Sequence, residues 1–151
     1  MVITLYVSNI ISQMRAISHR EVSAIDDAEA RYRAEAGTEK MDDIRHCVDD
    51  AYKRLLGRCS RFLKDSYTTA TSDNIGIPES YVIELSLSER RAINKADPLE
   101  EAMHNFVVEY ALSKFYSNVS QGDLSNKHSL AALDAGNNLE TLLYTKQPPR
   151  V

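Results

Sequence analysis

The sequence predicts a mostly α-helical fold, a small bundle of four to five helices with one strand or a minor β-hairpin. Five glycines and four prolines among 151 residues leave long stretches without helix breakers. Apolar residues recur at steps of three and four over most of the chain, the period of an amphipathic helix. Residues 81–88 instead alternate apolar and polar, the period of a strand. The length fits one domain, and because we find no repeat or domain-sized linker, we expect residues 1–151 to form a single helical domain.

The first half of the chain predicts helices in two segments. Helical steps run over residues 4–36, and the polar run at 18–21 predicts a kink or a division into two helices. Gly37 ends this segment, and Thr38 can cap the next. The second segment, from Thr38 to about residue 67, has the clearest apolar face, formed by Met41, Ile44, Val48, Ala51, Tyr52, Leu55, Cys59 and Phe62.

A polar loop at 68–79 leads into the strand, so we expect a loop and strand at about 68–89. A lone strand leaves backbone N–H and C=O groups without partners, so it must pair with something. Within the chain only Val2–Val7 offers another β-like run, and the other possible partner is a strand of another chain. The apolar side of the predicted strand consists of Tyr81, Ile83, Leu85 and Leu87.

The second half predicts two more helices. Asp97-Pro98 opens a helix that ends near residue 117, with an acid as cap and proline at the first helical position. Its apolar residues fall on two sides, so this helix is central to the fold or shared with a neighbouring subunit. Asp123 can cap a last helix, and a C-terminal tail follows at 146–151.

Composition and cysteine usage narrow the function classes. The net charge of −4 is unlike that of a protein that binds nucleic acid by neutralising phosphates. Cys47 and Cys59 lie in one predicted helix, about 18 Å apart, which is too far for a disulfide. They therefore predict free thiols in a reducing compartment. Because no signal peptide and no membrane-length apolar run is found, we expect a protein of the cytosol, or one made there.

Motifs for catalysis are missing from the sequence. The glycines never cluster as in a phosphate-binding loop, and neither His-Glu-x-x-His nor Cys-x-x-Cys occurs. His128 falls on the apolar stripe of the last helix and is interpreted as a partly buried histidine with a satisfied hydrogen bond. We therefore expect a protein that is not an enzyme and takes no cofactor.

One constellation supports an alternative, a di-metal carboxylate helical-bundle enzyme or metal store. Glu101-Ala-Met-His104 has the Glu-x-x-His spacing of ferritin-like di-iron bundles, and Asp43-Ile-Arg-His46 offers a second acid-x-x-His. Asp is too short to replace Glu easily at such a site. The further carboxylates would be Glu21 or Glu29, and Glu140. A third hypothesis is a helical regulatory module that binds another protein.

The order of features resembles small neck proteins of tailed phages and prophages, the head–tail connector or head-completion class. The residues that carry this resemblance are the strand 81–88, the acid–proline helix start, the aromatic-rich stretch 106–116, and the ending 142–150 with its Pro-Pro-Arg. The resemblance covers the last half of the chain, and the first half only in pattern. It implies a virion structural protein, assembled in the host cytoplasm.

This class implies a ring, commonly of twelve copies, between the portal and the tail. DNA would pass through the lumen without specific binding, the partners would be portal, tail or other neck proteins, and no membrane would be involved. The mild negative charge suits a channel wall along which DNA slides. We expect the assembly interface to include residues on the strand, on both sides of helix 98–117 and on the tail: Tyr81, Ile83, Leu85, Leu87, Phe106, Leu112, Phe115, Pro148, Pro149 and Arg150.

Overall fold

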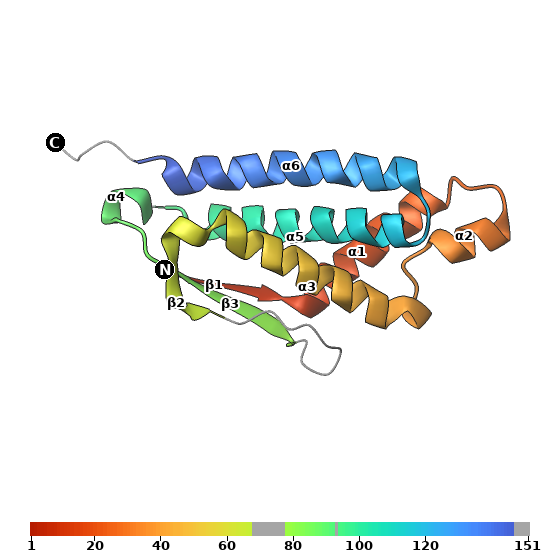
Figure 1. Cartoon of the computed structure of the whole chain (residues 1–151), viewed down its shortest axis with the longest axis horizontal. Helices are drawn as coiled ribbons and strands as arrows, with labels where there is room; N and C mark the ends of the chain where they lie inside the picture. Colours follow the sequence, from red (N-terminus) through yellow and green to blue (C-terminus); the bar gives the residue numbers. More distant parts are fainter. Residues whose placement is uncertain (68–77, 93, 147–151) are drawn as a thin grey trace.

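A computed structural model describes residues 1–67, 78–92 and 94–146, and its fold is mostly helical with a small antiparallel sheet (Figure 1). This confirms the predicted class. In chain order the elements are β1 (Val2–Tyr6), α1 (Val7–Val22), α2 (Ala28–Ala34), α3 (Met41–Arg58), β2 (Leu63–Tyr67), β3 (Ser80–Leu85), α4 (Glu89–Ala92), α5 (Ala96–Asn118) and α6 (Gly122–Tyr144), with short 3-10 turns at Thr38–Lys40 and Ser60–Phe62.

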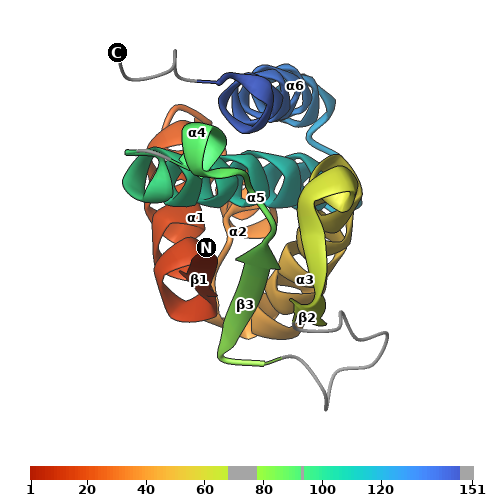
Figure 2. The ribbon, with the colours of Figure 1, turned by 90° about the vertical axis from the view of Figure 1, so that its left-hand side faces the viewer.

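The elements are arranged in layers around α5. Figures 1 and 2 show α6 on one side of α5 and the sheet on the other, with α1 and α3 flanking the space between α5 and the sheet. The central position of α5 explains why this helix is apolar on two sides. Its buried residues contact α6 on one side and α1, α3 and β1 on the others. Of the two sequence interpretations of this helix, the central position within one chain is the one observed.

The sheet has the strand order β1-β3-β2, and both pairings are antiparallel. The predicted strand is found as Ser80–Leu85, and its partner on one side is Val2–Tyr6, the in-chain alternative. Its other side pairs with Leu63–Tyr67, a stretch for which the sequence predicted helix. That prediction was wrong because α3 ends at Arg58, and the chain turns back to pair with β3. The predicted strand therefore has partners on both sides without a second chain.

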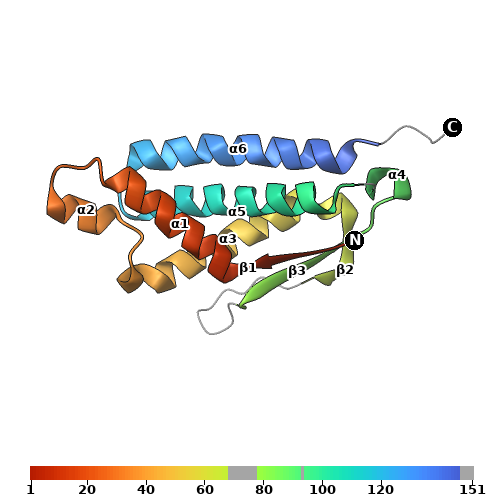
Figure 3. The ribbon, with the colours of Figure 1, turned by 180° about the vertical axis from the view of Figure 1, so that it is seen from behind.

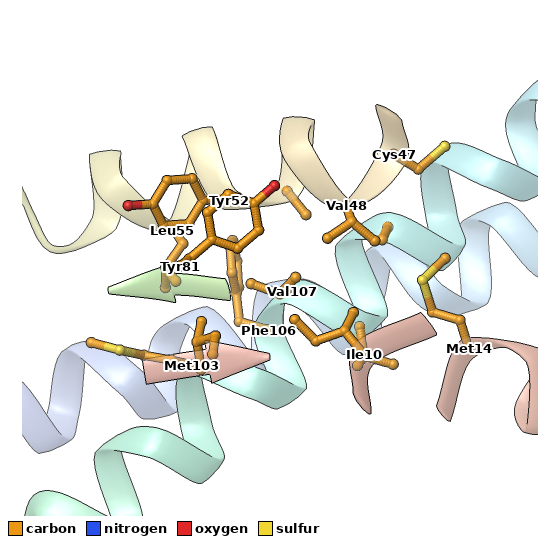
Figure 4. Close-up of a cluster of buried hydrophobic side chains, with 14 of the residues drawn as sticks. Ile10, Met14, Cys47, Val48, Tyr52, Leu55, Tyr81, Met103, Phe106 and Val107 are labelled. Atoms are coloured by element: carbon orange, nitrogen blue, oxygen red, sulfur yellow. The ribbon is translucent and has the colours of Figure 1, made fainter. Parts of the chain in front are cut away.

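The apolar side of the sheet packs against the helices in one continuous core (Figure 4). Ile3 and Leu5 of β1 and Tyr81, Ile83 and Leu85 of β3 all point into it. The ring of Tyr81 stacks on Tyr52 of α3 with centroids 3.9 Å apart, and its hydroxyl donates a 3.0 Å hydrogen bond to the buried carboxylate of Asp49. This polar pair shows that even the hydroxyl of the strand's largest side chain is satisfied within one chain.

The polar run at 18–21 lies in the last turns of α1, and the break between the two helices follows it at residues 23–27. α1 ends at Val22 and α2 begins at Ala28, where the Asp27 carboxylate accepts a hydrogen bond from the Glu29 backbone N–H. The segment is therefore divided into two helices, but the break was expected at the polar run 18–21 and comes after it. Buried Ser18 accepts a hydrogen bond at 2.9 Å from the N–H of Ala36, which fastens the end of this segment back onto α1.

Candidate functional site

The structure places most of the predicted interface residues in the core of a single chain. Their side chains are at most 3% exposed, so they contribute to the stability of the monomer and present no surface to a neighbour. The residues concerned are Tyr81, Ile83, Leu85, Phe106, Leu112 and Phe115. Leu87 is half-buried against the core, while Pro148, Pro149 and Arg150 lie outside the described residues. The argument that the strand and the two-sided helix need sister molecules is therefore overturned.

Four residues of the di-metal hypothesis, His104, Glu21, Glu29 and Glu140, have other partners. The ring of His104 contacts the side-chain oxygen of Gln13 at 2.5 Å. The three further acids are engaged with cationic or histidine side chains: Glu21 with Lys127 and His128, Glu29 with Arg33, and Glu140 with Arg58. Across residues 1–67, 78–92 and 94–146, no group of three or more histidine, cysteine, aspartate or glutamate side chains is arranged to hold a metal ion. The geometry thus gives the di-metal alternative no support.

A buried histidine joins three helices instead. His128 of α6 is 3% exposed and lies between two carboxylates. Its Nε2 is 2.7 Å from Oε1 of Glu21 on α1, and its Nδ1 contacts Oε2 of Glu109 on α5. Lys127 reaches the second oxygen of Glu21 at 2.6 Å, and Tyr116 donates a 3.1 Å hydrogen bond to the first. The interpretation of His128 as a histidine with satisfied hydrogen bonds is confirmed, and its burial is more complete than the partial burial expected.

The charges of this cluster stabilise each other. Burial lowers the pKa of His128, but hydrogen bonds and charge from Glu109 and Glu21 outweigh it, and the pKa is raised above its ordinary value. Burial acts to raise the pKa of Glu21, yet hydrogen bonds to Lys127 and His128 bring it below the usual range. Because His128 is enclosed, a substrate cannot reach its ring. The cluster therefore holds α1, α5 and α6 together.

Large apolar side chains that the sequence did not point to remain exposed on the sheet's outer face and on α6, and Tyr32 of α2 is also exposed. On the outer face of the sheet, register pairs Val2 with Glu84 and Thr4 with Val82, so these side chains share one face. Val2, Tyr6 and Val82 are 61%, 54% and 39% exposed there, and on α6 Leu130 and Leu133 are 65% and 49% exposed. The alternation in β3 was a usable signal for Val82, since every second residue of a half-buried strand faces outward. Leu130 and Leu133 fall off the buried stripe of α6, which was the corresponding signal there.

A groove runs beside β1, the edge strand of the sheet. It has a volume of about 320 Å³ and lies between β1 and the first turns of α5. Thr4, Leu5, Tyr6 and Asn9 line one side, and Asp97, Glu100, Glu101 and His104 line the other. Burial lowers the pKa of His104, and the charge of Glu100 opposes this shift. With three carboxylates on its α5 side, the groove is acidic.

Comparisons with family models, with curated proteins and with solved structures give no match for this chain. Within the part of the chain that the structure describes, no helix has both the length and the apolar character needed to cross a membrane.

Proposed function

We propose that this protein is a structural subunit of a tailed-phage virion, a head–tail connector that forms a ring between portal and tail. The resemblance of strand 81–88, the acid–proline helix start and the last helix to neck proteins supplies the class. The structural observation that carries the assembly role is the exposed apolar surface on two opposite layers, the sheet's outer face and α6.

Two different surfaces on opposite sides fit a head-to-tail contact. When one surface of a copy meets the other surface of the next, each copy has two neighbours, and the arrangement closes into a ring if the rotation permits. Leu130 and Leu133 would lie against Val2, Tyr6 and Val82 of an adjacent copy. Burying these side chains supplies the driving force, because roughly 25 cal/mol is gained for each Å² of apolar surface removed from water.

The partners and location follow from the proposed class. A subunit of the neck would meet portal and tail proteins above and below the ring, and DNA would pass through the lumen without specific contacts. It would be assembled in the host cytoplasm and end in the virion. The protein would act through its surfaces, with no catalytic step and no cofactor.

Mass photometry and sedimentation of the purified chain, alone and mixed with candidate portal proteins, test this function. We expect rings, and we expect Leu130→Glu or Val82→Asp to give a folded monomer, because each places a charge on an exposed apolar surface. Asn138→Glu, also exposed on α6 but on a different side of the helix from Leu130 and Leu133, is the matched control and should leave the rings intact. A wild-type chain that stays monomeric under all of these conditions would exclude the proposal.

A further inference from the structure

β1 has one backbone edge that no described element covers. Leu85 and Met1 exchange backbone hydrogen bonds of 2.7 and 3.1 Å, and the Val7 N–H donates to the Glu79 carbonyl at 2.9 Å. The odd-numbered residues of β1 therefore form the backbone hydrogen bonds to β3, and the backbone N–H and C=O groups of Val2 and Thr4 point to the opposite side. Outside the ladder with β3, no described residue forms a backbone hydrogen bond with Val2 or Thr4.

The sequence of β1 lacks the features that usually protect an edge strand. Val-Ile-Thr-Leu-Tyr contains no charge and no proline, and its register with β3 is regular over five consecutive pairs. The other edge strand, β2, carries Lys64 and has a register shift between Leu63 and Tyr67. Of the two edges of this sheet, β1 is therefore the one that is ready to accept another strand.

Acidic side chains beside this edge determine which strand fits. Asp97, Glu100 and Glu101 are exposed along the groove and form no ion pair with any described residue. The dipole of α5 alone could account for acids in its first turns, so the open edge is the primary observation, and the charges select the occupant. A second β1 across a two-fold axis is disfavoured, because it would bring two acidic rows together.

We infer that the β1 edge is a docking site for an extended, lysine- or arginine-rich segment of a different protein, which adds to the sheet as a fourth strand. Figure 3 shows this side of the molecule, with β1 lying below α5. Backbone hydrogen bonds to Val2 and Thr4 supply affinity, and cationic side chains facing α5 supply specificity. The inference rests on the proposed assembly role, because it names the chemistry by which the subunit would hold a partner other than its own copies.

Peptide binding to the full chain tests the inference. The probes are fluorescent eight-residue peptides that alternate valine with lysine, or valine with glutamate, measured by anisotropy at low salt. We expect the lysine peptide to bind at least tenfold more tightly than the glutamate peptide. The double substitution Glu100→Lys with Glu101→Lys should reverse this preference, since the groove then becomes basic.

A protein variant and a modified peptide distinguish strand addition from simple charge attraction. Thr4→Pro removes an outward N–H that the monomer does not use, and edge strands tolerate proline at such positions. Thr4→Val keeps the N–H and is the matched control. A lysine peptide with N-methyl groups on alternate residues keeps its charge but loses donors, so it remains informative if Thr4→Pro fails to fold. Thr4→Pro and N-methylation should each weaken binding at least tenfold, while Thr4→Val should not.

Binding that is unchanged by both N-methylation and Thr4→Pro would overturn the inference, as would equal affinity for the two unmodified peptides. The oligomeric state is measured separately, so the two hypotheses can fail independently. Peptide binding by a chain that never forms rings would uphold the docking site and contradict the proposed ring. Rings that do not bind the lysine peptide would contradict the docking site alone.

Discussion

At the scale of single residues, the buried histidine between two carboxylates shows what local sequence can and cannot predict. The apolar stripe of the last helix was sufficient to predict that His128 is at least partly buried and has hydrogen-bond partners. Its partners could not be predicted, because Glu21 and Glu109 lie on other helices, 107 and 19 positions away. Similarly, the acid-x-x-His spacing of Glu101 and His104 gave no information about Gln13, which comes from α1. Local sequence patterns report burial, whereas the choice of polar partner depends on how the helices pack.

The histidine cluster predicts a specific dependence of stability on pH. Because the pKa of His128 is raised in the folded state, its charge contributes fully to the free energy of unfolding below the ordinary pKa of 6.5. This contribution is lost as the pH rises through the folded-state pKa. The lowered pKa of Glu21 makes its contribution complete above the ordinary 4.5, and it is lost as the pH falls through the folded-state pKa. The cluster therefore stabilises the fold most between pH 4.5 and 6.5.

We predict that His128→Leu lowers the free energy of unfolding by about 3 kcal/mol near pH 6, because two carboxylates lose their buried cation. Urea denaturation of wild type and variant from pH 5 to pH 9 measures the difference, which should shrink as the pH rises. Lys127→Leu, at an exposed position, should cost less than about 1 kcal/mol. A difference for His128→Leu that is constant over this range would contradict the charged cluster.

At the scale of elements, periodicity was enough to locate the helices and the central strand but not the edges of the sheet. Residues 63–67 follow directly from a helical pattern, and only pairing with β3 makes them a strand. Local propensity cannot anticipate such a non-local contact. The same limitation applies to α5, whose two apolar sides indicated a central or shared helix without saying which. α6 covers one of those sides, so the shared surface has to be sought elsewhere.

Opposite faces of β3 should respond differently to the same charge. Leu85 is fully buried, so Leu85→Asp places a carboxylate in the core, and we predict a chain that does not fold. Phe106→Asp should have the same effect for the same reason. Val82→Asp, on the outer face of the same strand, should remain folded and lose about 1 kcal/mol or less. Circular dichroism and thermal unfolding make the comparison, and a folded, monomeric Leu85→Asp chain would contradict this assignment of faces.

At the scale of the whole molecule, hydrophobicity in the sequence indicated how much apolar surface the chain has but not which part folding covers. The strand and helix expected to face neighbours are internal, and the exposed apolar side chains lie on α6, on the sheet's outer face and at Tyr32 of α2. The sheet's outer apolar surface uses side chains of β1 and the docking edge uses backbone groups of the same strand, so Val82→Asp and Thr4→Pro test self-assembly and partner binding separately. A single core cluster includes side chains from the sheet and from α1, α3, α5 and α6, and it should open as one unit.

The two cysteines allow this cooperativity to be measured, because both lie in that core. Cys47 and Cys59 are free and buried, and burial is the main reason that the pKa of each thiol is raised to about 12. We predict that neither thiol reacts with a thiol reagent in the native state. The free energies of opening calculated from the two labelling rates should be the same, and both should equal the free energy of global unfolding. Ser129→Cys, on the exposed surface of α6, should react at once. Faster labelling of Cys59 than of Cys47 would show that the sheet end of α3 opens by itself, and the chain would then not behave as a single cooperative domain.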